Sequence, residues 1–556
     1  MEKLEELARQ PSANAAGLRL ALGNLSGVLK TLGFENLRPG QDEAIFNLFL
    51  GLDTLLLLPT GSGKSAVYII PTLCMGYRTL IFSPLIALMK NQVEVLWRYG
   101  LKAGVINSSQ GTAENAMMYS EWESGALNFL FVAPERLQDV KFWELMSRMP
   151  PDMLVVDEAH VASAWSDSFR PDYKKIGDMV SVLKPKSVLA LTATATPEVE
   201  EDVRHILHIE EAKRVLYLPQ RNNLHLSSED FRSDGQIYQA IAAIEGQSIC
   251  YCATVKRVNE LYASMGGSIK GGATCYTGKM TPAERDAAQN AFMCGDVNCV
   301  FATNAFGLGI DRSCIRGIVH ADAPASLDAL SQEQGRAGRD GLDAYCTAFF
   351  SDKAYGTQLY FIDVRYPEAE IVRRVYAYLK THADKAGIVK MTIEQIAGAV
   401  GERSDGAGAA MSILANFKVL DRSKDSDSVH NVRFVKPHLQ EEYARFVPAI
   451  EKIGFKNDRG FWEFDVTALA EALSLKPKKV ADSLKDLSTN GYIQWTAPFR
   501  GKISRIVGNV DLVDFDYLAR RRELSIKRLG ILWKYHRVPD ESKHDFISEY
   551  FRNGTA

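Results

Sequence analysis

The chain has 556 residues, of which 46% are hydrophobic and 24% charged, and these fractions exclude intrinsic disorder and collagen. Its 65 basic and 68 acidic residues leave a net charge of −3, so a polyanion would bind at a local site and not over the whole surface. No C-x-x-C pair occurs among the eight cysteines, all before residue 347, which favours reduced core thiols over a disulfide framework.

We expect no membrane-spanning segment in this chain and no export signal at its N-terminal end. The longest apolar stretches are strand-sized, whereas a membrane helix needs about 20 apolar residues. The first 17 residues contain acidic side chains and no apolar core of a secretory signal. We therefore expect a cytoplasmic protein without membrane contact, and an N-terminal helical extension over residues 1–33.

From residue 50 to 350, short apolar runs alternate with helix-like stretches. Runs that are apolar throughout and alternate with helices predict parallel sheets covered on both faces. A turn-like segment at 220–236 predicts the hinge between two α/β domains. The predicted strands are 54–58, 79–83, 129–133, 153–156, 188–191, 248–252, 299–303 and 317–321.

After residue 360 the pattern changes. The segments 361–440 and 441–510 each read as helix, turn, helix and short hairpin, so we expect two winged-helix-like α+β modules in series. The tail at 511–556 predicts a helical hairpin around a turn at Pro539. We expect the first module to serve packing or a protein partner.

A glycine-rich turn follows the first strand, in "LLLLPTGSGKS" at 55–65. Glycines let backbone N–H groups converge on phosphate, while Lys64 would reach the β and γ phosphates and Ser65 would hold Mg²⁺. The strict phosphate-loop pattern is not met, because Leu58 stands at the first glycine position. The alternative is a plain turn with a solvated lysine.

The run "MLVVDEAH" ends a second strand in Asp157 and Glu158. The first acid would hold Mg²⁺ through water, and the second would orient and deprotonate an attacking water. Surface acids at a strand end are the alternative. Farther along, "QEQGRAGRD" places Arg336 and Arg339 on one predicted helical face, where they would stabilise the charge of phosphoryl transfer, unless they form a salt-bridging pair.

Eight segments, in their order and spacing, resemble the motifs of the RecQ family of superfamily 2 DNA helicases. They are "GFENLRPGQDEAI", "LPTGSGKS", "SPLIALMKNQV", "VAPERL", "VVDEAH", "ALTATAT", "ATNAFGLGID" and "QEQGRAGRDG". The resemblance covers about residues 30–350. It implies two tandem RecA-like domains, at 34–218 and 219–360, with ATP and Mg²⁺ as cofactors.

The resemblance also assigns site residues. Lys64, Asp157, Glu158, Arg336 and Arg339 would carry hydrolysis, with Ser65 and Asp157 as Mg²⁺ ligands. The implied nucleotide-binding residues are Phe34, Arg38, Gln41, Thr60, Gly61, Ser62, Gly63, Lys64, Ser65, Gly309 and Asp311. The implied DNA-binding or coupling residues are Ser83, Trp165, Phe169, Arg170, Thr192, Thr194, Thr254, Thr303 and Asn304.

Two segments depart from the family pattern. In the aromatic-rich loop "VASAWSDSFRPDY", Ala164, Ser166, Asp167 and Ser168 replace the expected Gln, Gly, His and Asp, and core packing is the alternative role for its aromatic residues. The tail resembles the family's zinc-binding hairpin. We expect no zinc there, because zinc requires thiolates at such a site and no cysteine follows Cys346.

The resemblance implies an ATP-dependent DNA helicase that moves 3′ to 5′ on single-stranded DNA and unwinds duplexes, in DNA repair, recombination or genome defence. Its partners would be single-stranded DNA and single/double-strand junctions, and a protein partner through the C-terminal modules. We expect a nucleoid-associated monomer. The alternatives are an RNA-directed or double-strand translocase, and a DNA-binding ATPase subunit or scaffold of a larger assembly with weak or no unwinding of its own.

Overall fold

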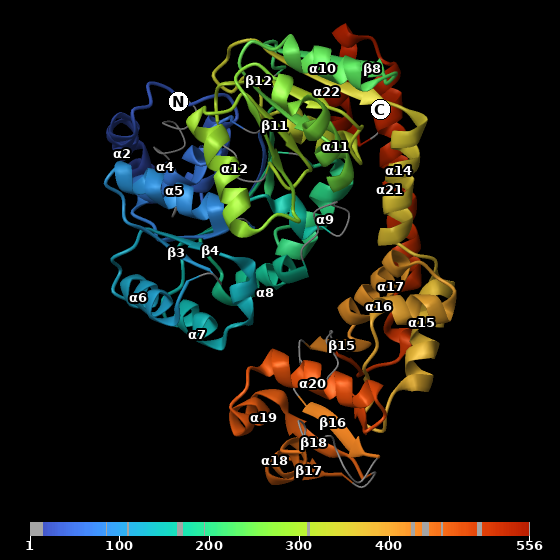
Figure 1. The fold of residues 1–556 in the computed structure, drawn as a ribbon. Coiled ribbons are helices and arrows are strands. Elements are labelled where there is room, and N and C mark those ends of the chain that lie inside the picture. Colours follow the sequence, from blue (N-terminus) through green and yellow to red (C-terminus); the bar gives the residue numbers. More distant parts are fainter. Residues whose placement is uncertain are drawn as a thin grey trace. The chain divides into compact units, whose positions relative to one another are not determined.

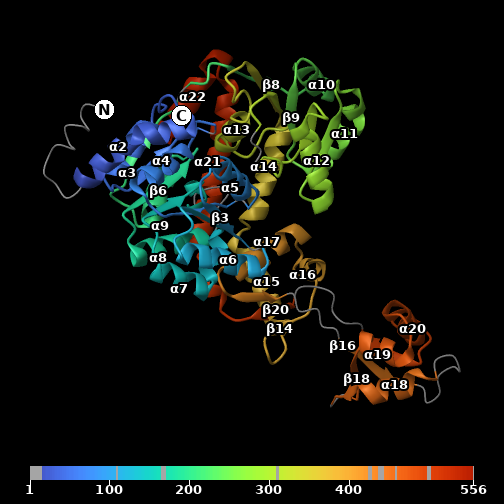
Figure 2. The ribbon, with the colours of Figure 1, turned by 90° about the vertical axis from the view of Figure 1, so that its left-hand side faces the viewer.

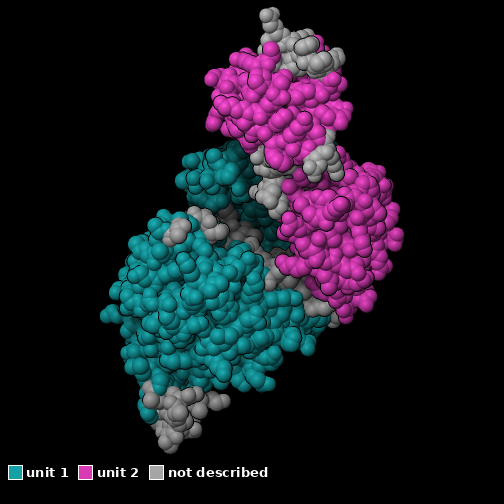
Figure 3. Space-filling model, turned by 90° about the horizontal axis from the view of Figure 1, so that it is seen from below, with its two compact units in different colours: residues 1–359, 524–556 teal, residues 360–523 magenta. Residues whose placement is uncertain are grey.

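The computed structural model describes residues 15–59, 61–84, 86–107, 110–163, 171–193, 195–218, 220–307, 312–423, 429–435, 444–457, 460–496 and 503–554. The chain divides into two compact units (Figure 3). The first unit comprises residues 1–359 with 524–556, and the second comprises residues 360–523. The first unit holds two parallel sheets, here named lobe 1 and lobe 2, together with part of the C-terminal hairpin.

Lobe 1, coloured blue to teal in Figure 1, is built on a seven-stranded parallel sheet. Its strand order is β3-β4-β2-β5-β6-β1-β7. Its strands are β1 Thr54–Leu57, β2 Thr79–Phe82, β3 Ala103–Ile106, β4 Phe129–Val132, β5 Met153–Val156, β6 Ser187–Thr192 and β7 Lys213–Leu216. Its helices are α2 Ala15–Leu32, α3 Gln41–Phe49, α4 Ala66–Met75, α5 Ile86–Arg98, α6 Thr112–Glu123, α7 Val140–Arg148, α8 Lys174–Leu183 and α9 Pro197–Leu207.

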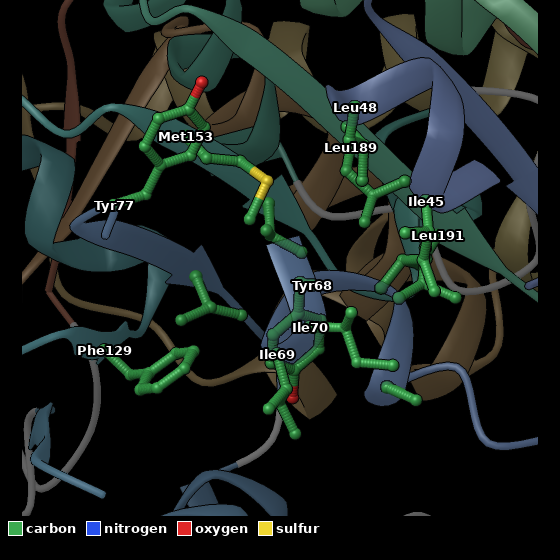
Figure 4. Packing of buried hydrophobic residues seen from close by; sticks show 14 of the residues in the cluster. Ile45, Leu48, Tyr68, Ile69, Ile70, Tyr77, Phe129, Met153, Leu189 and Leu191 are labelled. Carbon is green, nitrogen blue, oxygen red and sulfur yellow. The ribbon is translucent and has the colours of Figure 1, made fainter. Parts of the chain in front are cut away.

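The apolar strands of lobe 1 bury both of their faces. Met153 and Val155 of β5 pack in a core with side chains of α2 to α5, part of which is shown in Figure 4. Leu154 and Val156 of the same strand point into the opposite core, with side chains of α7 to α9. Because neighbouring strand residues point to opposite faces, a strand covered on both sides must be apolar at every position.

Lobe 2 has a six-stranded parallel sheet of order β10-β11-β9-β12-β13-β8 (Figure 2). Its strands are β8 Leu224–Asp230, β9 Gln247–Tyr251, β10 Ala273–Tyr276, β11 Cys299–Ala302, β12 Ile315–His320 and β13 Ala344–Phe350. Its helices are α10 Asp234–Ala242, α11 Val255–Met265, α12 Pro282–Cys294 and α13 Leu327–Gln334, after which α14 Asp352–Arg365 leads into the second unit.

All eight predicted strands coincide with strands of these two sheets. The predicted hinge at 220–236 is wrong in its extent, because most of it is β8 and the start of α10. Strand β8 lies at the sheet edge and pairs with β13. Its buried Leu224 and Leu226 alternate with the exposed His225, so it lacks the continuous apolar run of a central strand.

The C-terminal hairpin consists of α21 Phe515–Arg537 and α22 Lys543–Asn553, and its distal part packs on lobe 2 (Figure 2). Leu532 and Phe551 of the hairpin join an apolar core with residues of α13 and β13. A buried ammonium adds polar contacts. Lys543 Nζ donates to Ser228 Oγ at 2.8 Å, Val538 O at 2.9 Å and Tyr535 O at 3.1 Å.

The second unit contains two antiparallel sheets, each with its own helices. Module 1 has the winged-helix order of helix, strand, helix, helix and two strands. Its elements are α15 Ala369–His382, β14 Ile388–Val389, α16 Ile393–Val400, α17 Ser404–Asn416, β15 Leu420–Ser423 and β20 Ile503–Ile506. The elements of module 2 are β16 Val429–Phe434, α18 Phe446–Ile453, β17 Phe455–Lys456, β18 Trp462–Asp465, α19 Val466–Leu473, α20 Pro477–Thr489 and β19 Ile493–Thr496.

We expected from the sequence that the two modules follow one another along the chain, but this prediction is wrong. The central strand of module 1 is β20, which pairs with both β14 and β15. All of module 2 lies between β15 and β20, in the place of the wing of module 1. The predicted boundaries at 440 and 510 therefore separate β20 from its own sheet. A four-residue strand partnered about 80 residues back along the chain carries no local signal of its pairing.

No helix among the described residues is both long enough and apolar enough to cross a membrane.

The insertion leads to a deletion test. Ser423 pairs with Ile503 in antiparallel register, so replacing residues 424–502 by Asn-Gly should close β15 and β20 as a tight hairpin. We expect this variant to keep the circular dichroism signal and cooperative thermal unfolding of the remaining residues. A matched deletion that also removes β20 should lose the fold of module 1. Equal unfolding behaviour of the two deletions would contradict the assignment of β20.

Candidate functional site

The turn between β1 and α4 has the backbone that a phosphate-binding loop needs. Gly61 and Gly63 have φ angles of 81° and 77°, in the left-handed region that favours glycine. A Cβ atom at Gly63 would lie 2.7 Å from Gln41 Nε2, so a side chain at this position would displace the Gln41 amide. Lys64 Nζ donates to Leu58 O at 3.3 Å, and Ser65 Oγ donates to Gln92 Oε1 at 3.0 Å.

Gln41 fastens this loop to the start of α3. Its side-chain Nε2 donates to Ser62 O and to Gly63 O, each at 2.9 Å, and its Oε1 accepts from Arg38 N at 2.9 Å. Arg38 Nη1 donates to Gly61 O at 3.2 Å. Gln41 is buried, whereas Phe34 is exposed. The Gln41 amide thus holds the loop backbone in this structure, in addition to its implied role in nucleotide binding.

The two acids follow β5, the neighbour of β2 and β6 in the sheet. Asp157 accepts from Glu158 N at 3.0 Å and from Ser83 Oγ at 3.4 Å. Burial, and then the charge of Glu158, raise the pKa of Asp157 to about 7, although Lys64 acts in the opposite direction. A carboxyl with so high a pKa is poised for a cation, whose charge would restore the ionised form.

Glu158 has a strained backbone and an unsatisfied oxygen. Its φ of 49° places a non-glycine residue in the left-handed region. Its Oε2 atom is buried without a hydrogen bond, 3.4 Å from His160 Nδ1. His160 Nδ1 is also 2.9 Å from Thr192 Oγ1, at the end of β6. Glu158 therefore keeps one buried carboxylate oxygen beside His160 that is free to accept a hydrogen bond.

We predicted that Arg336 and Arg339 of lobe 2 lie on one helical face, and the structure shows that they do not. Helix α13 ends at Gln334, and both arginines lie in the turns that follow. Gly335 and Gly338 interrupt the helix, the latter with a φ of 55°. The two side chains therefore diverge: Arg336 is buried and donates to Gly307 O, whereas Arg339 reaches lobe 1. A Cβ atom at Gly61 would lie 3.3 Å from Arg339 Cγ.

The sequence of this region matches two family models, which are described as "DEAD/DEAH box helicase" over residues 38–203 and "Helicase conserved C-terminal domain" over residues 235–341. The chain is 36% identical over 328 residues to "ATP-dependent DNA helicase RecQ" of Pasteurella multocida, covering 58% of this chain and 51% of that protein. The protein of that name in Bacillus subtilis is 36% identical over 336 residues, which are 60% of this chain and 56% of the relative.

Residues 38–341, here called the RecQ region, are therefore similar in sequence to the DNA helicases named RecQ. The chain spans about half the length of these RecQ relatives. A solved structure of Mycobacterium smegmatis helicase Lhr bound to ssDNA and AMP-PNP aligns with a TM-score of 0.49 and 18% identity, covering 79% of this chain and 63% of that one.

Within this RecQ region, the predicted coupling residues lie at the carboxyl ends of sheet strands. Ser83 follows β2 and contacts Asp157, and Thr192 ends β6 and contacts His160. In lobe 2, Thr254 follows β9 and caps α11, accepting from Arg257 N at 3.1 Å. Thr303 and the exposed Asn304 follow β11, which neighbours β9. Neighbouring parallel strands end at the same edge of a sheet, so within each lobe these positions share one sheet edge.

Several predicted site residues lie outside the described residues. They are Thr60, Trp165, Phe169, Arg170, Thr194, Gly309 and Asp311. Sequence reasoning also missed residues that the structure connects to the site. Gln92 accepts from Ser65, and His160 joins Glu158 to Thr192. Arg221 and Asn223, between the lobes, bind the arginine-bearing loop. Most of these contacts join residues that are distant in sequence, so the sequence alone does not reveal them. Only the positions of Gln92 and His160 within the family motifs could have indicated that these two residues belong to the site.

The residues of this RecQ region fit a nucleoside triphosphate with Mg²⁺. The glycine cradle at 61–63, the unsatisfied Glu158 oxygen and the raised pKa of Asp157 each call for a phosphate, a water or a cation. Ser65 and Asp157 would leave most Mg²⁺ positions to water and phosphate oxygens, as is usual for this ion. In the described part of the chain, no group of three or more His, Cys, Asp or Glu side chains could hold a metal ion. The absence of zinc remains a prediction.

The buried Asp157 leads to a prediction on pH and stability. Its folded pKa of about 7 exceeds its ordinary 3.8, so stability from the protonated carboxyl is present at acidic pH and lost as the pH rises to about 7. Asp157→Asn should therefore raise the free energy of unfolding at pH 8 by about 1–4 kcal/mol, measured in EDTA without nucleotide. At pH 4 the gain should nearly vanish.

The exposed Asp178 of α8 offers a matched control. Asp178→Asn should change stability little at either pH, because its carboxyl is solvated in both states. A gain from Asp157→Asn that is the same at pH 4 and pH 8 would contradict the burial of an ionisable carboxyl at this position.

Proposed function

We propose that this chain is an ATP-dependent DNA helicase that translocates 3′ to 5′ on single-stranded DNA. The observation that carries the proposal is the contact of Arg339 from lobe 2 with Gly61 in the phosphate loop of lobe 1. A nucleotide held by residues of both lobes couples hydrolysis to their relative movement. The similarity of residues 38–341 to DNA helicases named RecQ supports DNA as the track.

Residues of lobe 1 would hold the nucleotide. The backbone N–H groups around Gly61 and Gly63 would surround phosphate oxygens, and Lys64 would exchange Leu58 O for the β and γ phosphates. Ser65 and Asp157 would hold Mg²⁺, Asp157 through water. When bound, ATP with Mg²⁺ supplies the phosphoryl group whose transfer to water drives the cycle.

Glu158 and Arg339 would carry the chemistry on either side of the γ phosphate. Glu158 would orient a water molecule and accept its proton on the unsatisfied Oε2 atom. Arg339 would place positive charge against the phosphoryl oxygens as negative charge shifts toward the leaving group. Arg336, which is buried on Gly307 O, would hold the loop after β11 and leave the phosphate to Arg339.

Two hydrogen bonds would couple DNA to hydrolysis. Ser83 Oγ contacts Asp157, and Thr192 Oγ1 contacts the histidine beside Glu158. Both residues stand at the sheet edge where we predict DNA contacts. Movement of a DNA strand over this edge would therefore reach the Mg²⁺ ligand through Ser83, and the base through Thr192 and His160.

Substitutions in the site test the chemistry. We expect Lys64→Ala and Glu158→Gln each to reduce DNA-stimulated ATP turnover by at least ~100-fold, because one loses phosphate contacts and the other its base. Binding of labelled single-stranded DNA should remain. Lys141→Ala and Glu144→Gln, at exposed positions of α7, are the matched controls and should leave turnover unchanged. Normal turnover by either site variant would remove this mechanism.

Duplexes with one tail test the direction. A motor moving 3′ to 5′ enters a duplex from a 3′ tail, so we expect ATP-dependent unwinding of 3′-tailed and forked duplexes and little of 5′-tailed ones. The Lys64→Ala variant controls for passive melting. DNA-stimulated turnover with no unwinding of any substrate would favour the alternative of an ATPase subunit in a larger assembly, and preference for 5′ tails would contradict the direction.

A further inference from the structure

The connection between the lobes carries an arginine that binds three carbonyl groups of one loop. Arg221 follows β7 and precedes β8. Its Nη2 donates to Gly338 O at 2.6 Å and to Ala337 O at 2.7 Å, and its Nη1 donates to Gly335 O at 3.1 Å. All three acceptors belong to the loop 335–342, which carries Arg336 and Arg339.

This loop has little regular structure of its own. It begins where α13 ends, and Gly338 turns it with a φ of 55°. Its carbonyls at 335, 337 and 338 therefore need donors from elsewhere, since an unsatisfied buried carbonyl is costly. Asn223 supplies a second set, its Nδ2 donating to Gly338 O at 2.8 Å and to Leu342 O at 2.9 Å. Two side chains of the interlobe connection thus define the course of the loop.

The geometry requires a guanidinium. A planar fork with five N–H donors can meet three carbonyls that face one side chain, whereas the ammonium of a lysine is a single point with rotating donors. Burial lowers the pKa of Arg221, and the nearby charge of Arg339 acts in the same direction. The hydrogen bonds described for Arg221 all go to backbone carbonyl groups, so this side chain holds the backbone of the loop.

The same connection is fastened to the sheet of lobe 1. Strand β7 lies beside β1, and Tyr217 N donates to Leu57 O at 3.1 Å, close to the start of the phosphate loop. A few residues later, Arg221 binds the arginine-bearing loop. A short segment therefore joins the strand that leads into one half of the site to the loop that supplies the other half.

We propose that Arg221 is a positioning residue that sets the distance of Arg339 from the phosphate loop. The proposal rests on the proposed function, in which Arg339 acts on the phosphoryl group. In this role Arg221 would act through the loop: it fixes the backbone from which Arg339 extends to Gly61. Displacement of a charged group by about 1 Å is enough to lower a rate by ~100-fold.

The test is the separation of turnover from binding in Arg221→Lys. We expect the kcat for DNA-stimulated ATP turnover to fall by ~10- to 100-fold, while the Kd for a non-hydrolysable ATP analogue changes less than about threefold. Arg204→Ala is the matched control, because Arg204 donates to the carbonyls of Glu210 and Ala212 in a turn of lobe 1. It should retain the wild-type kcat. Asn223→Ala removes the hydrogen bonds of Asn223 to the loop and leaves those of Arg221, so it should show a smaller fall in kcat.

A double-substitution cycle shows whether Arg221 acts through Arg339. If it does, Arg339→Ala combined with Arg221→Lys should turn over no more slowly than Arg339→Ala alone. Additive losses, or a wild-type kcat for Arg221→Lys, would overturn the proposal. A tenfold weaker Kd for the analogue, or unfolding of Arg221→Lys and Asn223→Ala at the assay temperature, would mean a structural role and would also overturn it.

The outcomes separate this proposal from the proposed function. Loss of turnover in Lys64→Ala and Arg339→Ala, with a wild-type kcat for Arg221→Lys, would remove only the role of Arg221. Absence of DNA-stimulated turnover in the wild-type chain, or full turnover by Arg339→Ala, would remove both.

Discussion

The contact between Arg339 and Gly61 is the constraint on which the rest of the motor region depends. It places a cation from one sheet against a phosphate loop that belongs to another. The approach is close because Gly61 has no Cβ atom and adopts a φ of 81°, which side chains disfavour. Each lobe therefore holds an incomplete site. In the proposed mechanism, a nucleotide held by both lobes would couple hydrolysis to their relative movement.

The acids beneath this contact are held at a cost to the fold. Asp157 is buried next to Glu158, and Glu158 keeps a left-handed backbone and an oxygen without a hydrogen bond. Such features destabilise a protein unless a ligand relieves them, and they gather at sites where charge must be ready before the reaction. The hydrogen bonds from Ser83 and from Thr192 by way of His160 join this prepared charge to the edge of the sheet.

In the second unit, one module is inserted into the sequence of the other, between β15 and β20. The ends of β15 and β20 lie side by side in antiparallel register, so a wing of two residues or a whole module can connect them with the same local geometry. Module 2 keeps its own core, formed by Phe446, Leu469, Leu484 and their neighbours. The hairpin that follows module 1 returns to lobe 2, where Lys543 supplies three hydrogen bonds from a buried ammonium.

By itself, the sequence determined the elements whose cause is local. Central strands such as β5 must be apolar on both faces, and the glycines and lysine of 61–64 must stand in one short turn, so periodicity and motif spacing revealed them. Only the tertiary structure decided where distant segments meet. The edge strand β8 reads as a turn because one of its faces is solvated, and β20 belongs to module 1 through pairing across an inserted module. Likewise, spacing placed Arg336 and Arg339 together, but Gly335 and Gly338 end the helix and send the two side chains to different partners. Hydrogen bonds between residues more than 100 positions apart, such as those of Arg221, leave no periodic trace in a single sequence.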